Sequence, residues 1–301
     1  MDKTDIILSQ LLMMNSRFSY RDLSDRVGLS VNAVHKRVRD LKDLGIIRAF
    51  TANVSLAALK AIGVFIFGSS GVDVTREVHD RLRNNDSTFW VAFAGGSYVY
   101  VGAYLQDVSQ LEPYVAFVKK EAYVGDPVVG IANSPFTFSK AGRLSTLDYQ
   151  IINALRRDSR KPVLDLAEQL GVSVKTARRR LTRMIQEGLI ELSLEWYPDA
   201  SNDVMTIFHV QLRSSADKAD VQALLTHKYG PSFFNIVSFS NLPNLLLCWV
   251  WTNTMKELRD VMERLQKEEA VESFVPNILY TGYIFETWRD RLVMEKGVFR
   301  K

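Results

Sequence analysis

Residues 23–38 read LSDRVGLSVNAVHKRV, and residues 166–181 read LAEQLGVSVKTARRRL. Both stretches belong to a longer repeat, in which residues 5–47 align with residues 148–190 at a constant offset of 143 and without a gap. Solenoid repeats have shorter periods, of roughly 20–50 residues. The repeat therefore indicates a duplicated pair of domains, and the fold of the repeated unit decides the fold of the chain.

Each copy predicts a short helix, a tight turn and a longer helix. In the first copy, Gly28 is placed to end one helix and Ser30 to cap the start of the next, and the second copy repeats this pair. After the serine, apolar residues recur at spacings of three and four, as on an amphipathic helix. This is the order of a helix-turn-helix. Short strands are predicted to follow at 46–50 and 189–194, which favours a winged form.

The exposed face of the longer helix is rich in basic side chains. In the second copy, residues 173–183 hold five basic residues and no acidic one, whereas a merely solvated face mixes both signs. Basic side chains neutralise phosphates, and Arg or Asn also reads base edges in the major groove. We therefore expect this face to bind DNA in both copies. The predicted DNA-binding residues are Ser30, Asn32, His35, Lys36, Arg39, Ser173, Lys175, Thr176, Arg178, Arg179 and Arg183.

Other basic residues are assigned different roles. Arg17, Arg160 and Lys161 precede the longer helices and are predicted to contact phosphates beside the groove. Arg37 and Arg180 lie next to the apolar stripe, so they are expected to hold an acidic partner inside the module.

Alternating strand and helix signals follow each helical module. In both cases the order is β-α-β-β-α-β, that of a ferredoxin-like domain. The first set is predicted at 61–67, 73–84, 89–94, 98–105, 108–121 and 128–132, and the second at 204–212, 216–229, 234–239, 245–251, 255–268 and 271–280. A further helix is expected at 284–295.

The predicted fold class is α+β, with two winged helix-turn-helix modules, each followed by a ferredoxin-like β-α-β-β-α-β domain. The predicted domains are 1–52, 53–138, 139–196 and 197–301, with a polar linker at 133–146. Helices cover only one face of such a sheet, and the other face is aromatic here, with Tyr98, Tyr100, Tyr104, Trp249 and Trp251. These faces are expected to bury against one another or against a second chain, and we predict a homodimer or larger assembly.

Composition sets further bounds. A net charge of +4 and a pI near 9.0 permit a nucleic-acid partner. The single cysteine, Cys248, excludes an intrachain disulfide. The polar start is unlike a signal peptide and the apolar runs are too short to span a bilayer, so a cytoplasmic protein is expected. The four histidines lack a partner at metal-ligand spacing and no phosphate-binding loop is found, so no metal, cofactor or enzymatic activity is expected.

The two quoted stretches, each followed by a ferredoxin-like element order, resemble the leucine-responsive regulatory protein/asparagine-operon regulator (Lrp/AsnC) family of bacteria and archaea. The resemblance covers nearly the whole chain, twice. It implies a sequence-specific DNA-binding transcriptional regulator whose sheet domains dimerise. It also implies an amino-acid effector near one hairpin turn, which here is Gly95, Gly96, Ser97 and Tyr98. The alternative is that these residues only form the turn. The second copy departs from the pattern there, with Asn-Leu-Pro-Asn at 241–244.

Two alternatives lie outside this function. Sirohaem decarboxylases resemble the same family, but they need basic residues and histidines around a porphyrin pocket, whereas His79, His209 and His227 are predicted on or beside outer elements. The other alternative is a non-specific chromosome-architectural protein, which would bind scrambled DNA equally well. Because the exposed helix positions differ between the copies, a regulator of this kind is expected to read an asymmetric operator.

Overall fold

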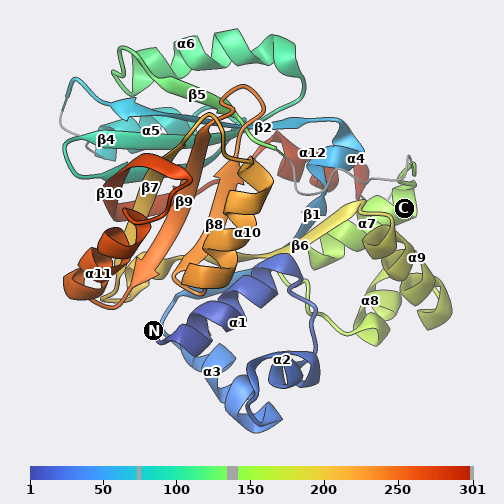
Figure 1. Cartoon of the computed structure of the whole chain (residues 1–301). Coiled ribbons are helices and arrows are strands. Elements are labelled where there is room, and N and C mark those ends of the chain that lie inside the picture. The colour runs from blue at the N-terminus through green and yellow to red at the C-terminus, as the bar shows by residue number, and fades with distance from the viewer. Residues whose placement is uncertain (73–75, 134–141, 299–301) are drawn as a thin grey trace.

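A computed structural model describes the chain at residues 1–72, 76–133 and 142–298 (Figure 1). Two helical modules lie on one side of a pair of packed β-sheets (Figure 1). The modules comprise α1 (Lys3–Met14), α2 (Tyr20–Val27) and α3 (Val31–Asp43), and then α7 (Thr146–Leu155), α8 (Val163–Leu170) and α9 (Val174–Gln186).

Both helix-turn-helix predictions are confirmed, down to the residues that begin and end the helices. Gly28 and Gly171 follow α2 and α8 in the left-handed conformation, with φ of 69° and 64°. The hydroxyl of Ser30 accepts a hydrogen bond of 3.2 Å from the amide three residues on, and that of Ser173 accepts one of 3.1 Å. Each bond satisfies an amide that the helix itself leaves unpaired.

The strand after each module pairs with the strand of the other module. β1 (Ile47–Val54) and β6 (Ile190–Trp196) form a two-stranded antiparallel sheet of their own. The expected wings are therefore not separate, because each module supplies one strand to a single shared sheet. The pairing satisfies the backbone groups of both strands, and it joins the two modules edge to edge.

The ferredoxin-like order is confirmed twice. The first sheet contains β2 (Ile62–Ser69), β3 (Thr88–Ala94), β4 (Tyr98–Leu105) and β5 (Val128–Ile131), with α5 (Arg76–Arg83) and α6 (Leu111–Glu121); the second contains β7 (Val204–Leu212), β8 (Phe233–Ser238), β9 (Leu245–Thr252) and β10 (Val271–Ile284), with α10 (Lys218–Tyr229) and α11 (Met255–Leu265). A short helix, α4 (Leu56–Leu59), precedes β2. Residues 73–75 of the predicted helix, and 134–141 of the predicted linker with the domain boundary at 138, lie outside the described residues.

The last strand belongs to both sheets. Residues 271–278 of β10 pair with β7, and residues 279–284 pair with β3, which gives the order β5-β2-β4-β3-β10-β7-β9-β8. The strand is longer than predicted because residues 281–284 complete the pairing with β3. For the same reason the extra helix begins later than expected, as α12 (Trp288–Lys296).

The aromatic faces of the two sheets pack against each other within the chain. Their contact contains a buried cluster that includes Phe67, Tyr100, Ile207, Phe239 and Trp249. The approach is close at Gly130, where an added Cβ would lie 2.3 Å from the ring of Phe239. The prediction that the sheets bury against one another is confirmed, so these faces no longer call for a second chain.

Candidate nucleic-acid interface

The two modules meet as a pseudo-symmetric pair. Ser16 and Ser159 occupy equivalent positions in the repeat, and their hydroxyl oxygens lie 2.5 Å apart. Both residues are fully buried. The contact lies beside the shared sheet, since the amide of Ser159 donates to the carbonyl of Phe50 on β1 at 2.9 Å. The modules are therefore held in one fixed relation by contacts from both copies.

Two of the three residues predicted to contact phosphates take part in this pairing. The Arg17 guanidinium donates to two backbone carbonyls of the second module, and the Arg160 guanidinium donates to two of the first, at 2.6 and 2.8 Å. The Lys161 ammonium donates to a carbonyl at the end of α7 and to the side chain of Gln169, at 3.2 and 2.9 Å. Because their donors are engaged within the protein, we leave these three residues out of the proposed DNA-contacting set.

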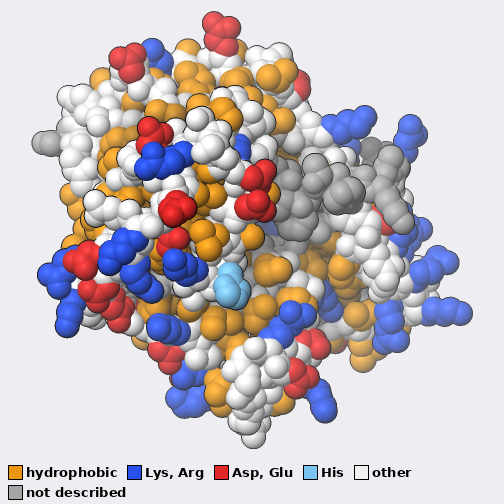
Figure 2. All heavy atoms as spheres, viewed as in Figure 1, with side chains coloured by type: hydrophobic (Ala, Val, Ile, Leu, Met, Phe, Trp, Pro, Cys, Tyr) orange, Lys and Arg blue, Asp and Glu red, His pale blue; other side chains and the backbone are white. Residues whose placement is uncertain are grey.

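The exposed faces of α3 and α9 carry most of the predicted DNA-binding residues. Figure 2 shows Lys and Arg side chains gathered around the region of α9. On these faces the exposed members of the predicted set are Asn32, His35, Lys36, Arg39, Lys175, Arg178 and Arg179. Among the described ion pairs, none involves Lys175, Arg178 or Arg179, so α9 presents three uncompensated charges.

Four predicted residues hold the helices instead. Ser30 and Ser173 are the caps described above, and the half-buried Thr176 lies 2.9 Å from the hydroxyl of Ser173. The Arg183 guanidinium turns inward and donates to Asp148 at 2.8 Å. On α3, Lys36 is partly neutralised by Asp40, one turn on, at 2.9 Å.

The structural role predicted for Arg37 and Arg180 is confirmed. Arg37 contacts Asp2 and Asp5, both at 2.8 Å, and Arg180 contacts Asp148 at 3.3 Å. The Asp148 side chain is fully buried. Burial would raise the pKa of this carboxyl, but hydrogen bonds from Ser145 and the charges of the two arginines outweigh burial and lower the pKa. The ionised carboxylate thus anchors α9 to α7.

The four residues predicted as a ligand site form the turn between β3 and β4. Gly96 and Ser97 both have positive φ, of 68° and 58°, as a tight hairpin turn requires. The Gly95 amide donates to β10 at 3.2 Å, and the Ser97 carbonyl accepts from Ser70 at 2.9 Å. Tyr98 is half-buried beside His209, with ring centroids 5.6 Å apart. The four residues thus form the predicted turn, and their role as a ligand site stays a prediction.

The prediction that His209 lies on or beside an outer element is wrong. His209 lies between the two sheets, where the Tyr100 hydroxyl approaches its ring nitrogen to 2.6 Å, and burial lowers its pKa to about 4. The sequence predicts that His209 lies on β7. It does not show which face of that strand the other sheet covers, because this depends on residues far away in the chain. His79, in contrast, lies on α5 and packs against Tyr283, with ring centroids 4.2 Å apart.

The sequence also did not reveal a cavity of about 360 Å³, which lies between the sheets and the segment that joins β6 to β7. Its walls come from elements far apart in the chain. Within residues 1–72, 76–133 and 142–298, no helix is long and apolar enough to cross a membrane, and no group of three or more His, Cys, Asp or Glu side chains is arranged to hold a metal ion.

Comparison with known proteins matches the two modules separately. Residues 1–48 and 144–191 both match the winged helix-turn-helix DNA-binding family. An uncharacterised HTH-type transcriptional regulator of Pyrococcus furiosus is 29% identical over 124 residues, covering 40% of this chain and 84% of that protein. The HTH-type transcriptional regulator LrpA of Pyrococcus horikoshii is 30% identical over 76 residues, covering 25% of this chain and 52% of that protein.

A solved structure matches the whole chain. The siroheme decarboxylase NirDL covers 98% of both chains with a TM-score of 0.60, at 14% sequence identity. At this identity the likeness shows the fold alone, and it supports the tandem arrangement of modules and sheets.

The fold and the matched modules define a DNA-binding protein with two winged helix-turn-helix units, each followed by a ferredoxin-like sheet. Residues 1–48 and 144–191 are two modules of the winged helix-turn-helix DNA-binding family, and parts of the chain are similar to HTH-type transcriptional regulators, LrpA among them.

Proposed function

We propose that this protein is a sequence-specific transcriptional regulator that reads DNA with two non-identical helix-turn-helix modules. The observation that carries the proposal is the exposed face of α9, where Lys175, Arg178 and Arg179 have no acidic partner among the described residues. A stable fold gains nothing from three uncompensated cations on one helix face, whereas a phosphate backbone neutralises them. The relatives named as transcriptional regulators support the same function.

The test is salt-dependent binding to DNA fragments selected from a random pool. Arg178→Ala with Arg179→Ala should weaken binding and reduce the slope of log affinity against log salt by about one unit for each lost phosphate contact. Lys119→Ala with Lys120→Ala removes the same charge from the exposed end of α6 and should leave both quantities unchanged. An unchanged slope in the first variant would refute the role of α9.

Sequence specificity needs its own measurement, because an architectural protein would also bind DNA through basic helices. The selected fragment should bind more tightly than a scrambled fragment of equal length, and a regulator of this kind is expected to exceed non-specific affinity about a thousandfold or more. Equal affinity for both fragments would favour the architectural function.

The whole-chain likeness to NirDL favours a second candidate, a porphyrin-processing enzyme. Such a pocket must receive several carboxylates, which requires basic groups. Among the described residues that line the cavity between the sheets there are two aspartates and no Lys, Arg or His. This cavity therefore does not fit a polycarboxylate, and we keep the regulator as the proposed function, although a neighbouring groove is lined by Arg48, Arg156, Arg157 and Arg289. Binding of an iron-uroporphyrin, seen as a shifted visible absorption band, would reverse that conclusion.

Homo-oligomerisation and an amino-acid effector stay predictions. Light scattering tests the first, and a monomeric mass would mean that one chain supplies both modules for one DNA site. For the second, Gly95–Tyr98 is the position that the family resemblance implies, and substitution of Ser97 should then abolish any response of DNA binding to amino acids.

A further inference from the structure

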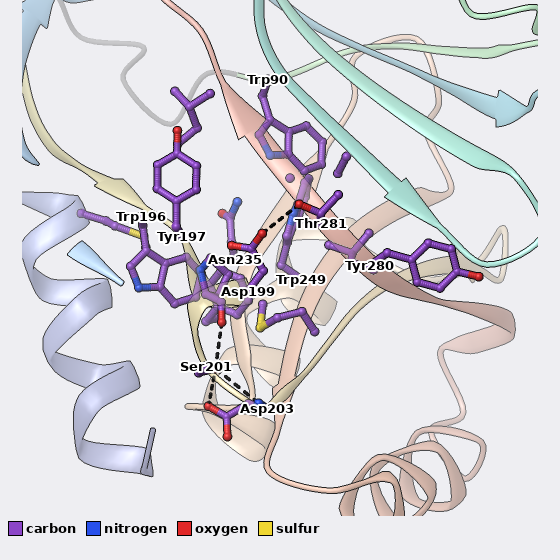
Figure 3. A pocket seen from close by; sticks show the side chains of 18 of the residues that line it. Trp90, Trp196, Tyr197, Asp199, Ser201, Asp203, Asn235, Trp249, Tyr280 and Thr281 are labelled. Carbon is purple, nitrogen blue, oxygen red and sulfur yellow. Dashed lines mark hydrogen bonds between the residues drawn. The ribbon is translucent and has the colours of Figure 1, made fainter. Parts of the chain in front are cut away.

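A cavity of about 360 Å³ opens where the two halves of the molecule meet (Figure 3). Its walls come from β2, β3, β6, β7, β8, β9 and β10, from α1, and from the segment between β6 and β7. Figure 3 shows Trp196 and Tyr197 on one side of this space, Trp90 and Trp249 on the other, and the Asp199 side chain between them. None of the four residues of the β3–β4 turn lines it.

The walls are an aromatic cage. The rings of Trp90 and Trp249 have centroids 5.8 Å apart, and Phe65 contacts both, at 6.1 and 5.6 Å. On the opposite wall, Trp196 and Phe234 pack edge to face at 4.9 Å. Ring faces carry negative electrostatic potential and attract organic cations, most strongly when the cation is desolvated.

The charged groups of the cavity also favour a cationic ligand, because the described lining contains two aspartates. The Asp203 carboxylate is already occupied by the amino group of Met1 at 2.9 Å and by the Ser201 hydroxyl at 2.9 Å. Asp199 accepts one hydrogen bond, from Thr281 at 2.9 Å, and no described ion pair involves it. Asp199 is exposed, so its carboxylate stands at the solvent-facing rim of the cage, with capacity for a cationic donor.

A ligand carboxylate would find neutral donors inside, such as the Asn235 amide, but no cationic side chain among the described lining residues. The described lining contains no Lys, Arg or His. Arg48 stacks on the ring of Tyr197 at 3.6 Å and lines a neighbouring groove, outside the cavity. Arg156, Arg157 and Arg289 border a neighbouring groove, where each is paired with a glutamate. Burying an unpaired carboxylate is costly, so the cavity selects against zwitterionic amino acids and polycarboxylates.

We propose that this cavity binds a small organic amine, with its ammonium group at Asp199 and its apolar body against the tryptophans. Trp196 ends β6 of the shared sheet and Met13 lies on α1, so an occupant touches elements that hold both modules. If the amine alters DNA binding, that effect rests on the proposed regulatory function. Binding of the amine in the cavity does not depend on that function.

The experiment compares three ligands that share one aromatic body. Isothermal titration of the full chain, without DNA, uses 2-phenylethylamine as the cation, 2-phenylethanol as the neutral form and L-phenylalanine as the zwitterion. The amine should bind at least about tenfold more tightly than either of the others, as expected for a charge-assisted hydrogen bond together with cation–π contacts. Quenching of tryptophan fluorescence should follow the same saturation curve, since three of the five tryptophans line the cavity.

Asp199→Asn is the diagnostic variant. It preserves size and the bond from Thr281, and it should remove about tenfold of the affinity for the amine while leaving the affinity for 2-phenylethanol unchanged. Asp126→Asn, at an exposed site away from the cavity, is the matched control and should change neither. Absence of amine binding, equal affinity for all three ligands, or an unaffected Asp199→Asn variant would each overturn the proposal. Because no DNA is present, these results stand apart from the DNA-binding test.

Discussion

Helices α3 and α9 occupy equivalent positions in the two modules but differ in the charge that they carry. Helix α3 contains four basic and two acidic residues, whereas α9 contains five basic residues and none that is acidic. The repeat offset of 143 places Asp40 of α3 opposite Arg183 of α9. In the first module Asp40 neutralises Lys36 on the exposed face, and in the second Arg183 turns inward to Asp148.

A single exchanged position thus alters two properties at once. It leaves Arg179, the counterpart of Lys36, without an acidic neighbour one turn on, and it adds a second arginine to the buried anchor. The anchor carboxylate accordingly differs: the Asp5 side chain is 16% exposed and that of Asp148 is 0% exposed. The second module therefore has more charged groups than the first, both at its buried carboxylate and on its exposed helix face.

The largest expected effect is at this anchor. Asp148→Asn leaves Arg180 without its described counter-ion and Arg183 with Glu187 alone, at 3.4 Å, and it should destabilise the second module by about 3 kcal/mol, as for a broken buried pair. Asp5→Asn should cost about 1 kcal/mol, because Arg37 keeps Asp2 and the site is partly solvated. Hydrogen exchange of α7–α9 and of α1–α3 measures the two losses separately. Equal losses would remove the distinction between the modules.

The sheets differ as well, since the second half supplies the histidine at their contact and the first supplies its tyrosine partner. The pKa of His209 is lowered from 6.5 to about 4 by burial, so between these values the unfolded chain binds a proton that the folded chain does not. The free energy of unfolding should therefore decrease as the pH is lowered through this window, by about 3 kcal/mol in total and at most about 1.4 kcal/mol per pH unit. Below it the loss is complete.

His209→Phe should flatten this part of the pH dependence of urea unfolding. His35→Gln, at an exposed position of α3, is the control and should retain the wild-type slope. A His209→Phe curve parallel to that of the wild type would show that His209 does not titrate as its burial indicates.

The two modules should contribute equally to the contact between them, although their helices α3 and α9 differ in charge. Arg17→Ala and Arg160→Ala each remove two bonds to backbone carbonyls, and each should cost about 1 kcal/mol. Neither should change the salt slope of DNA binding by a full unit, unlike Arg178→Ala. A full-unit loss in either variant would restore that arginine to the phosphate-contacting set.

The smallest effect tests whether α3 can be made to resemble α9. Asp40→Ala frees Lys36 and should raise DNA affinity a few-fold at low salt, with a salt slope steeper by up to about one unit. Asp43→Ala, also on α3 but at its last residue, is the comparison for the same loss of charge. Identical gains in both variants would mean that only net charge matters.

Much of this architecture follows from local signals in the sequence. Gly28 and Ser30 act within a few residues of themselves, and so do Gly171 and Ser173, because turns and caps are local hydrogen-bonding problems. The element order of each sheet likewise follows from periodicity and turns. The structural role of Arg37 was predictable from its place beside the apolar stripe.

What could not be predicted depends on partners distant in the chain. Nothing in residues 47–54 indicates that their strand partner is 190–196, since an edge strand accepts any compatible neighbour. Arg17 reads as a free surface cation until the carbonyls of the other module are placed around it. The amine cavity is beyond sequence reasoning for the same reason, because Trp90, Trp196 and Trp249 meet only in the folded chain.

The sheet shared by β1 and β6 fixes the distance and orientation between the two helix-turn-helix modules. Because each strand completes the other, neither module can swivel or slide without breaking backbone hydrogen bonds in both. The separation of α3 and α9 is then a constant of the fold. Sites would be selected by the spacing of their halves as strictly as by their bases, and a half-turn insertion between the halves would put one of them on the wrong side of the duplex.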